Sequence, residues 1–460
     1  MQLVERPTDR FAVSSLALST AEQFDVRRGP VSQPMTILWM VNFDYPTRLH
    51  HGSTLRHVNY ARELQALGHR VFFGVRFDPK YLEESREWFT HLREQGVISD
   101  FFEISYVPAA WPRRLASLTF HPYLANRVLT RPQRETTLAV RELMAKCDAN
   151  AVIVSDRDFW FLADTLMPFE PLVVDMCDCA SLYMAREIRQ HVKARRFGPA
   201  RQMLRNFLYT VSEDRYYARK GNAAVVVSPV DQQALARVSG GSSHVVALLN
   251  GVSAPPAPNS IRKIKNRLIF SGNMDFPPNY GAAVWFLDHV FPRIVEQEPD
   301  AQLVVAGANP PVFLQERASA NVIVTGYVED LNAEIARSSL YVVPMVTGGG
   351  FKNKVVEAIV NRTYVVATPL AVEFLDPNTR GLITVAEAPE EMAEKIVQLL
   401  REPEACSARL SALYDHVTQT FTWSRRAGEL VEIIRTGALN DGTRQSGRPK
   451  RPPESVSRPG

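Results

Sequence analysis

The amino-acid sequence predicts an α/β protein made of two doubly wound parallel-sheet domains in tandem. The chain has 460 residues, more than one hydrophobic core usually serves. Short β-branched or aromatic runs alternate with segments whose apolar residues recur at spacings of three and four, as in repeated βα units. A proline-rich stretch at 253–260 interrupts this alternation, which then restarts.

The first domain is predicted at 34–252, after a disordered tail at 1–33. An apolar strand at 35–41 leads through a loop into a helix that Ser53 opens and Gly68 closes as a C-cap, and the next strand is at 71–75. The remaining strands of this domain are predicted at 101–107, 151–155, 172–176, 223–228 and 244–249.

The second domain is predicted at 261–437, after a linker at 253–260 and before a disordered tail at 438–460. Its strands are predicted at 267–272, 302–306, 322–325, 340–344 and 364–367, with helices at 279–295, 310–317, 329–338 and 353–361. Ligands of such Rossmann-like sheets bind beyond the carboxyl ends of the strands, so two facing domains are expected to enclose a central cleft.

The composition excludes several functional classes. The net charge of +4 is too small to indicate nucleic acid as a partner. The four cysteines are Cys147, Cys177, Cys179 and Cys406. They are too few for a disulfide framework and lack the pairing of a zinc site. No apolar run approaches the ~18 residues that span a bilayer, and Glu5 and Asp9 do not fit a signal peptide. We therefore expect a cytoplasmic protein.

The most informative segment lies between a predicted strand and a predicted helix. Gly348, Gly349 and Gly350 let the backbone approach a ligand, and the following helix points its free N–H groups at the same place. Lys354 and Glu357 are three residues apart, so they share one helix face, opposite a face of valine and isoleucine. The lysine suits a pyrophosphate and the carboxylate suits ribose hydroxyls. A solvated Lys and Glu pair after a glycine loop is the alternative.

This segment resembles the donor-binding motif of glycosyltransferase family 4, whose members are retaining enzymes of GT-B fold. Gly350 to Glu357 follows the pattern G-x-K-x-K-x-x-E, which is similar to sugar transferases associated with exopolysaccharide assembly. The stretches LIFSGNMDFPP at 268–278, LVVAG at 303–307 and VTGYVEDL at 324–331 agree with it, and the likeness covers roughly 35–435. The first of the family's two motif glutamates falls on Gly349, so that carboxylate is absent.

The resemblance implies a donor site. The family's Arg and Lys after the first strand of this domain are missing around Asn273, so Lys352 and Lys354 are expected to neutralise the diphosphate. No D-x-D motif stands in a suitable loop, so neither a metal nor a cofactor is expected. The residues assigned to the donor are Gly52, Asn273, Gly326, Tyr327, Val328, Gly348, Gly349, Gly350, Phe351, Lys352, Lys354 and Glu357. The residues assigned to catalysis are Lys354, Glu357 and Asp178.

The acceptor is expected on the first domain, near His51 and Asp178. For His51 the alternative is a solvated loop residue, and for Asp178 it is a helix N-cap before Ser181. Two cationic segments, one from Trp111 to Arg134 and one from Arg186 to Arg205, suggest an anionic membrane surface or a lipid-linked acceptor. A charged helix face in water is the alternative. If these segments do meet a membrane, the protein is expected to be peripheral on the inner face of the plasma membrane.

The predicted activity is transfer of a sugar from a nucleoside diphosphate sugar to a polysaccharide, lipid-linked or other glycan acceptor. The segment at 423–436 resembles the last GT-B helix, which returns to the first domain. A sugar-nucleotide 2-epimerase of the same fold and a glycosyltransferase-like subunit that binds but no longer catalyses are the two rival interpretations.

Overall fold

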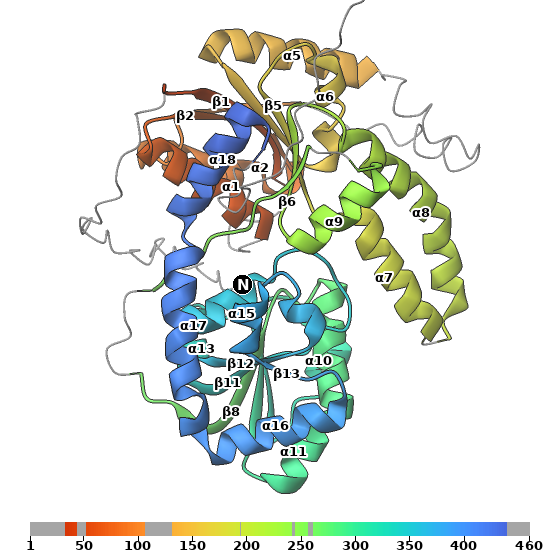
Figure 1. Ribbon diagram of the computed structural model, residues 1–460, viewed down its shortest axis with the longest axis vertical. Coiled ribbons are helices and arrows are strands. Elements are labelled where there is room, and N and C mark those ends of the chain that lie inside the picture. Colours follow the sequence, from red (N-terminus) through yellow and green to blue (C-terminus); the bar gives the residue numbers. More distant parts are fainter. Residues whose placement is uncertain are drawn as a thin grey trace, which may run out of the picture. The chain divides into compact units, whose positions relative to one another are not determined.

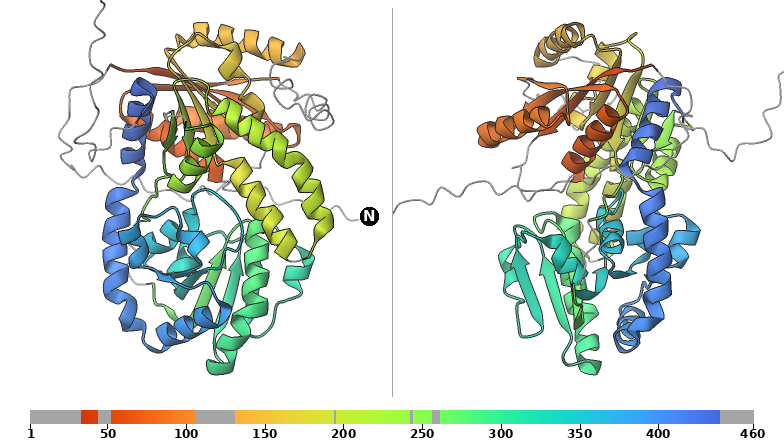
Figure 2. Two further views of the ribbon diagram at one scale, coloured as in Figure 1. Left: turned by 45° about the vertical axis from the view of Figure 1, so that its right-hand side comes forward. Right: turned by 90° about the vertical axis from the view of Figure 1, so that its left-hand side faces the viewer.

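The computed structural model describes residues 33–43, 52–105, 131–193, 195–241, 244–255 and 261–438. These residues form two parallel β-sheets, each with helices packed on it (Figure 1; Figure 2). The α/β architecture of two doubly wound sheets that the sequence predicts is therefore confirmed.

The first sheet has seven parallel strands in the order β3-β2-β1-β4-β5-β6-β7. The order reverses between β1 and β4, the arrangement of a doubly wound sheet. The strands are β1 (Thr36–Phe43), β2 (Arg70–Phe77), β3 (Asp100–Glu103), β4 (Ala151–Ser155), β5 (Leu172–Cys177), β6 (Ala223–Val226) and β7 (Val245–Ala247). The accompanying helices are α1 (Gly52–Ala66), α2 (Leu82–Glu94), α5 (Arg131–Cys147), α6 (Leu162–Thr165), α7 (Ala180–Lys193), α8 (Phe197–Tyr217) and α9 (Pro229–Val238).

Strand β1 shows why its continuous apolar run folds as a central strand. Successive side chains of a strand point to opposite faces, and helices cover both faces of a parallel sheet. Ile37 and Trp39 accordingly lie in one apolar cluster, whereas Leu38 and Met40 lie in another. All four side chains are buried. The run is therefore apolar at every position instead of alternating with polar residues.

The second sheet has six parallel strands in the order β10-β9-β8-β11-β12-β13. The strands are β8 (Ile264–Ser271), β9 (Gln302–Ala306), β10 (Val322–Gly326), β11 (Ser338–Val343), β12 (Tyr364–Ala367) and β13 (Thr384–Val385). The helices are α10 (Pro277–His289), α11 (Phe291–Gln297), α12 (Val312–Gln315), α13 (Leu331–Ala336), α14 (Asn353–Val360), α15 (Pro377–Gly381), α16 (Pro389–Arg401), α17 (Ser407–Thr420) and α18 (Trp423–Thr436).

The helix expected at 279–295 is two helices, α10 and α11, that meet at Val290. Pro292 lies in the first turn of α11. Proline lacks an N–H and clashes with the preceding turn, so it starts a helix more easily than it continues one. The two-residue strand β13 was not predicted, because so short a run carries no periodicity.

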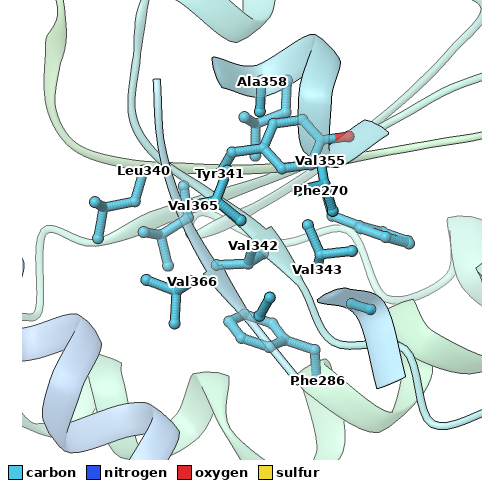
Figure 3. Close-up of a cluster of buried hydrophobic side chains, with 14 of the residues drawn as sticks. Phe270, Phe286, Leu340, Tyr341, Val342, Val343, Val355, Ala358, Val365 and Val366 are labelled. Atoms are coloured by element: carbon cyan, nitrogen blue, oxygen red, sulfur yellow. The ribbon is translucent and has the colours of Figure 1, made fainter. Parts of the chain in front are cut away.

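Helix α14 is anchored by the face that the sequence predicts to be apolar. Val355, Val356 and Ile359 are buried against the second sheet, among residues such as Phe270 and Val343 (Figure 3). Burying one such side chain contributes about 1.5–3 kcal/mol. The opposite face is only half-buried. The helix therefore presents its polar side away from the core at the carboxyl edge of β11.

The last helix, α18, packs on elements of the first sheet. It lies beside α1 and is drawn in dark blue in Figure 1. Its Leu430 shares an apolar cluster with Trp39 of β1, and the rings of Trp423 and Tyr60 are 5.4 Å apart. Thr422, just before α18, bridges to Val252 in the chain that leaves the first sheet. The linker boundary itself stays a prediction, since 256–260 lie outside the described residues.

Three glycines end neighbouring strands at the carboxyl edge of the second sheet. Gly272 follows β8, Gly307 follows β9 and Gly326 ends β10. The Gly272 N–H donates to Ala306 O at 3.0 Å, and the Gly307 N–H donates to Gly326 O at 2.9 Å. A Cβ on Gly307 would lie 1.8 Å from Gly272 O. The backbone of Gly307 can approach Gly272 this closely only because Gly307 has no side chain.

We therefore expect Gly307→Ala to destabilise the protein by about 3 kcal/mol or more, since the contact is with backbone and the φ of Gly307 is +140°. Urea denaturation measures the change. The matched control is Gly281→Ala within α10, where a Cβ meets nothing within 4 Å. That change should be neutral or stabilise by up to about 1 kcal/mol. Equal effects at the two positions would contradict the close approach.

In the described part of the chain, no helix is both long and apolar enough to cross a membrane.

Candidate functional site

The triglycine segment forms the turn between β11 and α14. Gly348 has a φ of +120° and Gly350 a φ of +73°, backbone regions that favour glycine. The first N–H groups of a helix have no partner within it, and the helix dipole places partial positive charge there. The turn therefore brings bare backbone and the N-terminus of α14 to the carboxyl edge of the sheet, where an anion can be held.

Lys354 lies in the first turn of α14. Its Nζ donates to Asn279 Oδ1 at 2.7 Å and is 4.5 Å from the centre of the Phe270 ring. Burial lowers the pKa of Lys354 to about 7, although the carboxylate of Glu357 acts in the opposite direction. No carboxylate of the described residues lies within 4.0 Å of this ammonium. The charged form of Lys354 therefore has no carboxylate partner and is available for a ligand.

Glu357 is the polar neighbour of Lys354 on the same half-buried face. Burial raises the pKa of its carboxyl, and the charge of Lys354 opposes the rise. The side-chain oxygens accept no hydrogen bond from any residue whose side chain is described. An ionised carboxylate can only accept, so its natural partners are hydroxyl or N–H donors of a ligand. This placement fits the predicted ribose contact, which stays a prediction.

Two residues of the predicted donor set have buried side chains. The Nζ of Lys352 donates to Gly349 O at 2.7 Å and to Gly350 O at 3.0 Å, and the side chain is buried. Phe351 is also buried, with its ring 4.3 Å from that of Phe374. Both residues precede α14, so the helical spacing does not set the direction of their side chains. The ammonium of Lys352 is therefore hydrogen-bonded within the turn. Its expected role at a diphosphate stays a prediction.

The site extends from Lys354 along the glycine-lined edge of the sheet. The Nζ of Lys354 is 3.0 Å from the place that a Cβ on Gly272 would take. Asn279, which binds Lys354, also donates to the backbone oxygen of Asn273 at 2.8 Å. The predicted residue Asn273 is thus linked to Lys354 through Asn279. The sequence-based site prediction did not include Asn279 or Gly307. The glycine at the end of each of three successive strands could have indicated Gly307.

The predicted nucleobase loop follows Gly326, whose φ is +69°. Tyr327 exposes 60% of its surface, whereas Val328 packs partly against the core of the second sheet. Of these two residues, Tyr327 is therefore the exposed one. Contact with a base stays a prediction for both residues.

Asp178 reaches the triglycine turn from the end of β5. Its Oδ1 lies 2.2 Å from the place that a Cβ on Gly350 would take, so only glycine fits there. The side chain keeps an exposed surface. Loss of hydration and the charge of Asp231 raise the pKa of Asp178 to about 6, against the opposing charge of Lys352. A carboxylate of the first sheet thus lies beside the anion site of the second.

The alternative N-cap role of Asp178 is not what the structure shows. The N–H of Ser181, in the first turn of α7, donates to Asp214 Oδ2 at 2.7 Å. Asp214 therefore serves the start of this helix. No hydrogen bond to the Asp178 carboxylate comes from the described residues, so this group is open to a ligand.

Helix α7 also holds the segment that precedes the turn. Arg186 donates to Gly348 O at 2.9 Å and forms a bidentate pair with Glu373, at 2.7 and 2.8 Å. Gln190 donates to the backbone oxygen of Val346 at 2.6 Å, and Glu187 accepts from Thr347. Arg186 is thus engaged with the donor turn and does not belong to an exposed cationic face. Sequence reasoning missed Gln190 and Glu373, which no local motif marks.

The other predicted site residues belong to the first domain. Gly52 is the first residue of α1, at the carboxyl edge of the first sheet. His51, and the part of the first cationic segment at 111–130, lie outside the described residues. No group of three or more His, Cys, Asp or Glu residues suited to a metal ion occurs in the ranges that the structure describes.

The fold is that of solved GT-B glycosyltransferases. A glycosyltransferase from Rickettsia africae is 14% identical and superposes with a TM-score of 0.58, covering 88% of this chain and 99% of that one. HepE of Anabaena in complex with UDP and glucose is 14% identical, with a TM-score of 0.60 over 87% and 99%. S. aureus TarM, in complex with fondaparinux, alpha-GlcNAc-glycerol and UDP, is 10% identical, with a TM-score of 0.57 over 87% and 99%.

The sequence comparisons find similarity to glycosyl transferases in the second domain. An uncharacterised 44.6 kDa protein in the cps region of Klebsiella pneumoniae is 25% identical over 139 residues, which is 28% of this chain and 36% of that protein. The chain thus matches about a third of that relative's length. Residues 265–402 match the family model described as glycosyl transferases group 1. The fold is thus of the GT-B class, and residues 265–402, within the second domain, are similar to group 1 glycosyl transferases.

Proposed function

We propose that this protein transfers a sugar from a nucleoside diphosphate sugar to a polysaccharide, lipid-linked or other glycan acceptor, with retention and without a metal ion. The observation that carries the proposal is the N-terminus of α14, where Lys354 and the unbonded carboxylate of Glu357 share one half-buried face. HepE and TarM were solved with UDP, which makes UDP-sugars the first donors to test. The cps-region relative supports a polysaccharide acceptor.

In the proposed reaction, the bond between the anomeric carbon and the diphosphate oxygen breaks, and its electron pair stays on the diphosphate. An acceptor hydroxyl forms the new bond to that carbon on the same face, and its proton leaves with the diphosphate. The α14 amides and Lys354 would stabilise the charge that develops on the leaving group. Asp178, whose pKa is about 6, is mostly ionised at pH 7 and would orient the acceptor hydroxyl by accepting its hydrogen bond.

The test is incubation of the protein with a panel of UDP-, GDP-, ADP- and TDP-sugars in the presence of EDTA. The proposal predicts transfer to a glycan acceptor, or slow hydrolysis of one donor when no acceptor is added. Conversion of the donor to its 2-epimer would identify an epimerase instead. Thermal stabilisation by a nucleotide without turnover would identify a binding subunit that has lost catalysis. Activity that appears only after a metal ion is added would contradict metal independence.

The alternative hypothesis, a subunit that binds a nucleotide but does not catalyse, is based on two groups that are missing or engaged at the site. Gly349 takes the place of the first family glutamate, and the ammonium of Lys352 is used within the turn. Lys354 and Glu357 nevertheless keep a charge and a hydrogen-bond acceptor for a ligand. We therefore place catalysis ahead of simple binding.

We further propose that the connection between α7 and α8 meets an anionic membrane surface, on which a lipid-linked acceptor would lie. Residues 188–212 contain no acidic residue. Lys193, Arg195, Arg196 and Arg201 are exposed there. The exposed large apolar side chains of the same region are Val192, Phe197, Leu204 and Leu208. Phe197, Leu204 and Leu208 follow helical spacing, so α8 carries an apolar stripe beside basic residues, the pattern of an interfacial helix.

Reversing the charges of Arg195 and Arg196 to Glu is expected to weaken binding to phosphatidylglycerol vesicles about tenfold or more, since each basic residue near an anionic surface contributes about 1 kcal/mol. Vesicle sedimentation measures the binding. The control is Arg237→Glu, an exposed residue of α9. Wild-type protein that does not sediment with these vesicles, or equal loss in the control, would end the membrane proposal without touching the proposed activity.

A further inference from the structure

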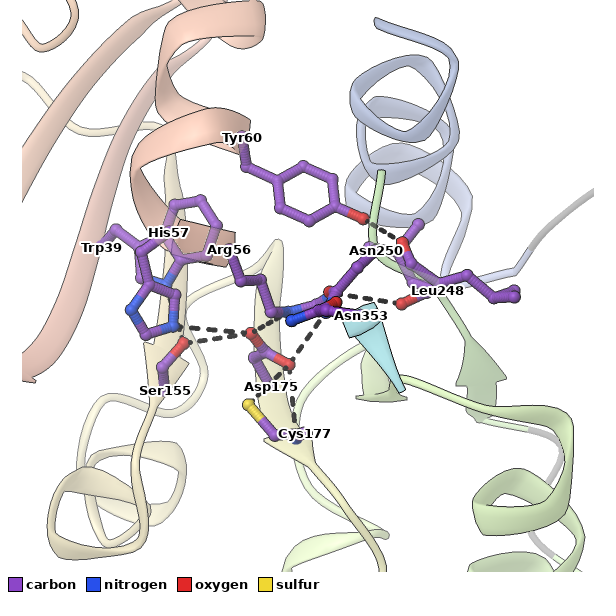
Figure 4. Close-up of polar contacts among 11 residues, drawn as sticks. Trp39, Arg56, His57, Tyr60, Ser155, Asp175, Cys177, Leu248, Asn250 and Asn353 are labelled. Atoms are coloured by element: carbon purple, nitrogen blue, oxygen red, sulfur yellow. Dashed lines mark hydrogen bonds and ion pairs between the residues drawn. The ribbon is translucent and has the colours of Figure 1, made fainter. Parts of the chain in front are cut away.

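A buried arginine of the first sheet is connected to the donor helix of the second. Arg56, in α1, is almost inaccessible to solvent. Its Nε lies 3.2 Å from Asp175 Oδ2 at the end of β5, and its Nη1 donates to Leu248 O at 3.1 Å and to Asn250 Oδ1 at 2.8 Å (Figure 4). The guanidinium also lies 4.9 Å from the centre of the Tyr60 ring. Arg56 thus ties the end of β5 to the chain that leaves the first sheet.

Asn250 also contacts the start of α14. Its Nδ2 donates to Asn353 Oδ1 at 3.0 Å. Arginine can only donate, so the oxygen of the Asn250 amide must face Arg56 and its nitrogen must face Asn353. Asn353 is the first residue of α14 and immediately precedes Lys354. Two hydrogen bonds, the first buried and the second partly buried, therefore connect the Arg56 guanidinium to the start of the donor helix.

The end of β5 meets the same region by a second route. Asp178, three residues after Asp175, lies against Gly350 in the triglycine turn. One strand end thus reaches the turn directly through Asp178 and reaches α14 through Arg56, Asn250 and Asn353. Together these two sets of contacts hold the Asp178 carboxylate in a defined position relative to Lys354. The planar guanidinium of an arginine, with several N–H donors in fixed directions, can hold these partners in place better than the single ammonium of a lysine.

We propose that Arg56 is a positioning residue for sugar transfer, which acts through Asn250 and Asn353 to hold the start of α14 in register with Asp178. The proposal rests on the proposed function and adds a group that touches neither donor nor acceptor. Misplacement of reacting groups by about 1 Å can lower a rate about a hundredfold, so a relay of this kind can control the rate without contacting the substrate.

The experiment compares Arg56→Lys, Asn353→Ala and the double variant. Lysine keeps the positive charge beside Asp175 but lacks the planar fork, and alanine removes the acceptor for Asn250. Each single change should lower kcat at least about tenfold, whereas the Kd for UDP should change less than about threefold. The double variant should be no slower than the slower single one, because both changes break one relay. Arg62→Lys, exposed on the same helix, is the matched control.

Unchanged kcat in the folded variants, or effects that multiply in the double variant, would overturn the positioning role. A second measurement does not need turnover. Amide hydrogen exchange at 350–356 should be faster in Asn353→Ala and in Arg56→Lys than in wild type, and unchanged exchange there would also overturn it. If wild type neither binds UDP nor transfers sugar, the proposed function fails, while the exchange result still decides whether the relay holds α14.

Discussion

Replacing Lys354 by Met is expected to lower kcat/KM for sugar transfer by about 100- to 1000-fold, the loss typical of removing one group that stabilises developing charge. Lys352 is occupied by the carbonyls of Gly349 and Gly350, and Arg186 is paired with Glu373. Lys354 is therefore the cation of the turn that is left for the leaving diphosphate. Steady-state kinetics with the donor found in the panel measure the effect.

The same lysine gives the donor site a pH dependence whose sign follows from its pKa. In the free protein the pKa of Lys354 is about 7, so near neutral pH the ammonium is only partly formed. A bound diphosphate favours the charged form and raises this pKa. Binding of UDP at pH 7–8 should therefore take up protons, and affinity should fall as the pH rises above 7. Calorimetry in buffers of different ionisation enthalpy measures the uptake.

In Lys354→Met, both the proton uptake and the fall of affinity between pH 7 and pH 9 should disappear. The control is Lys265→Met, an exposed lysine of β8 that should leave kinetics and proton uptake unchanged. A Lys354 variant that keeps wild-type kcat/KM would show that the diphosphate is neutralised elsewhere.

Glu357→Gln is expected to raise KM for the donor about 10- to 100-fold, because hydrogen bonds to charged groups contribute about 1.5–3 kcal/mol. The glutamine side chain has the same shape and can still accept a hydrogen bond through its amide oxygen. The substitution therefore measures the effect of removing the negative charge. The carboxylate has no partner among the described residues that would be left unpaired. The increase in KM therefore reports the ligand contact itself.

A ribose contact makes a second, more specific prediction for Glu357. The wild type should prefer ribonucleotide donors over 2′- or 3′-deoxy donors, and Glu357→Gln should lose most of that preference. Competition by deoxynucleotide analogues measures it. The control is Glu316→Gln, an exposed residue after α12. A preference that survives in the Glu357 variant would assign ribose recognition to another group.

Much of the fold could be predicted because periodicity and glycine or proline punctuation are local signals. The apolar run of β1 and the amphipathic pattern of α14 both correspond to what the structure shows. The break at Val290 was missed because α10 and α11 continue one apolar pattern across it. The strand at 101–107 is shorter in the structure, at Asp100–Glu103.

Side-chain direction in the donor motif was less predictable than its position. Lys354 and Glu357 lie inside the helix, where spacing dictates the face, and their predicted placement agrees with the structure. Lys352 has a φ of −95° and a ψ of 83°, outside helical geometry, so spacing could not show that its ammonium returns to the turn. Phe351 precedes it and is buried against Phe374.

The individual hydrogen bonds between elements of the two sheets could not be predicted. Arg186 meets Gly348 across 162 residues of sequence, and Asn250 meets Asn353 across 103. No motif links such positions in a single sequence. They depend on tertiary packing, which brings together elements whose local patterns are independent.

A crystal structure of the protein with bound UDP tests the central claim most directly. We expect the diphosphate at the triglycine turn, with a phosphate oxygen within hydrogen-bond distance of Lys354 Nζ and another on the first amides of α14, and a ribose hydroxyl donating to Glu357. UDP bound elsewhere, with the turn bare and Lys354 still on Asn279 alone, would contradict the account.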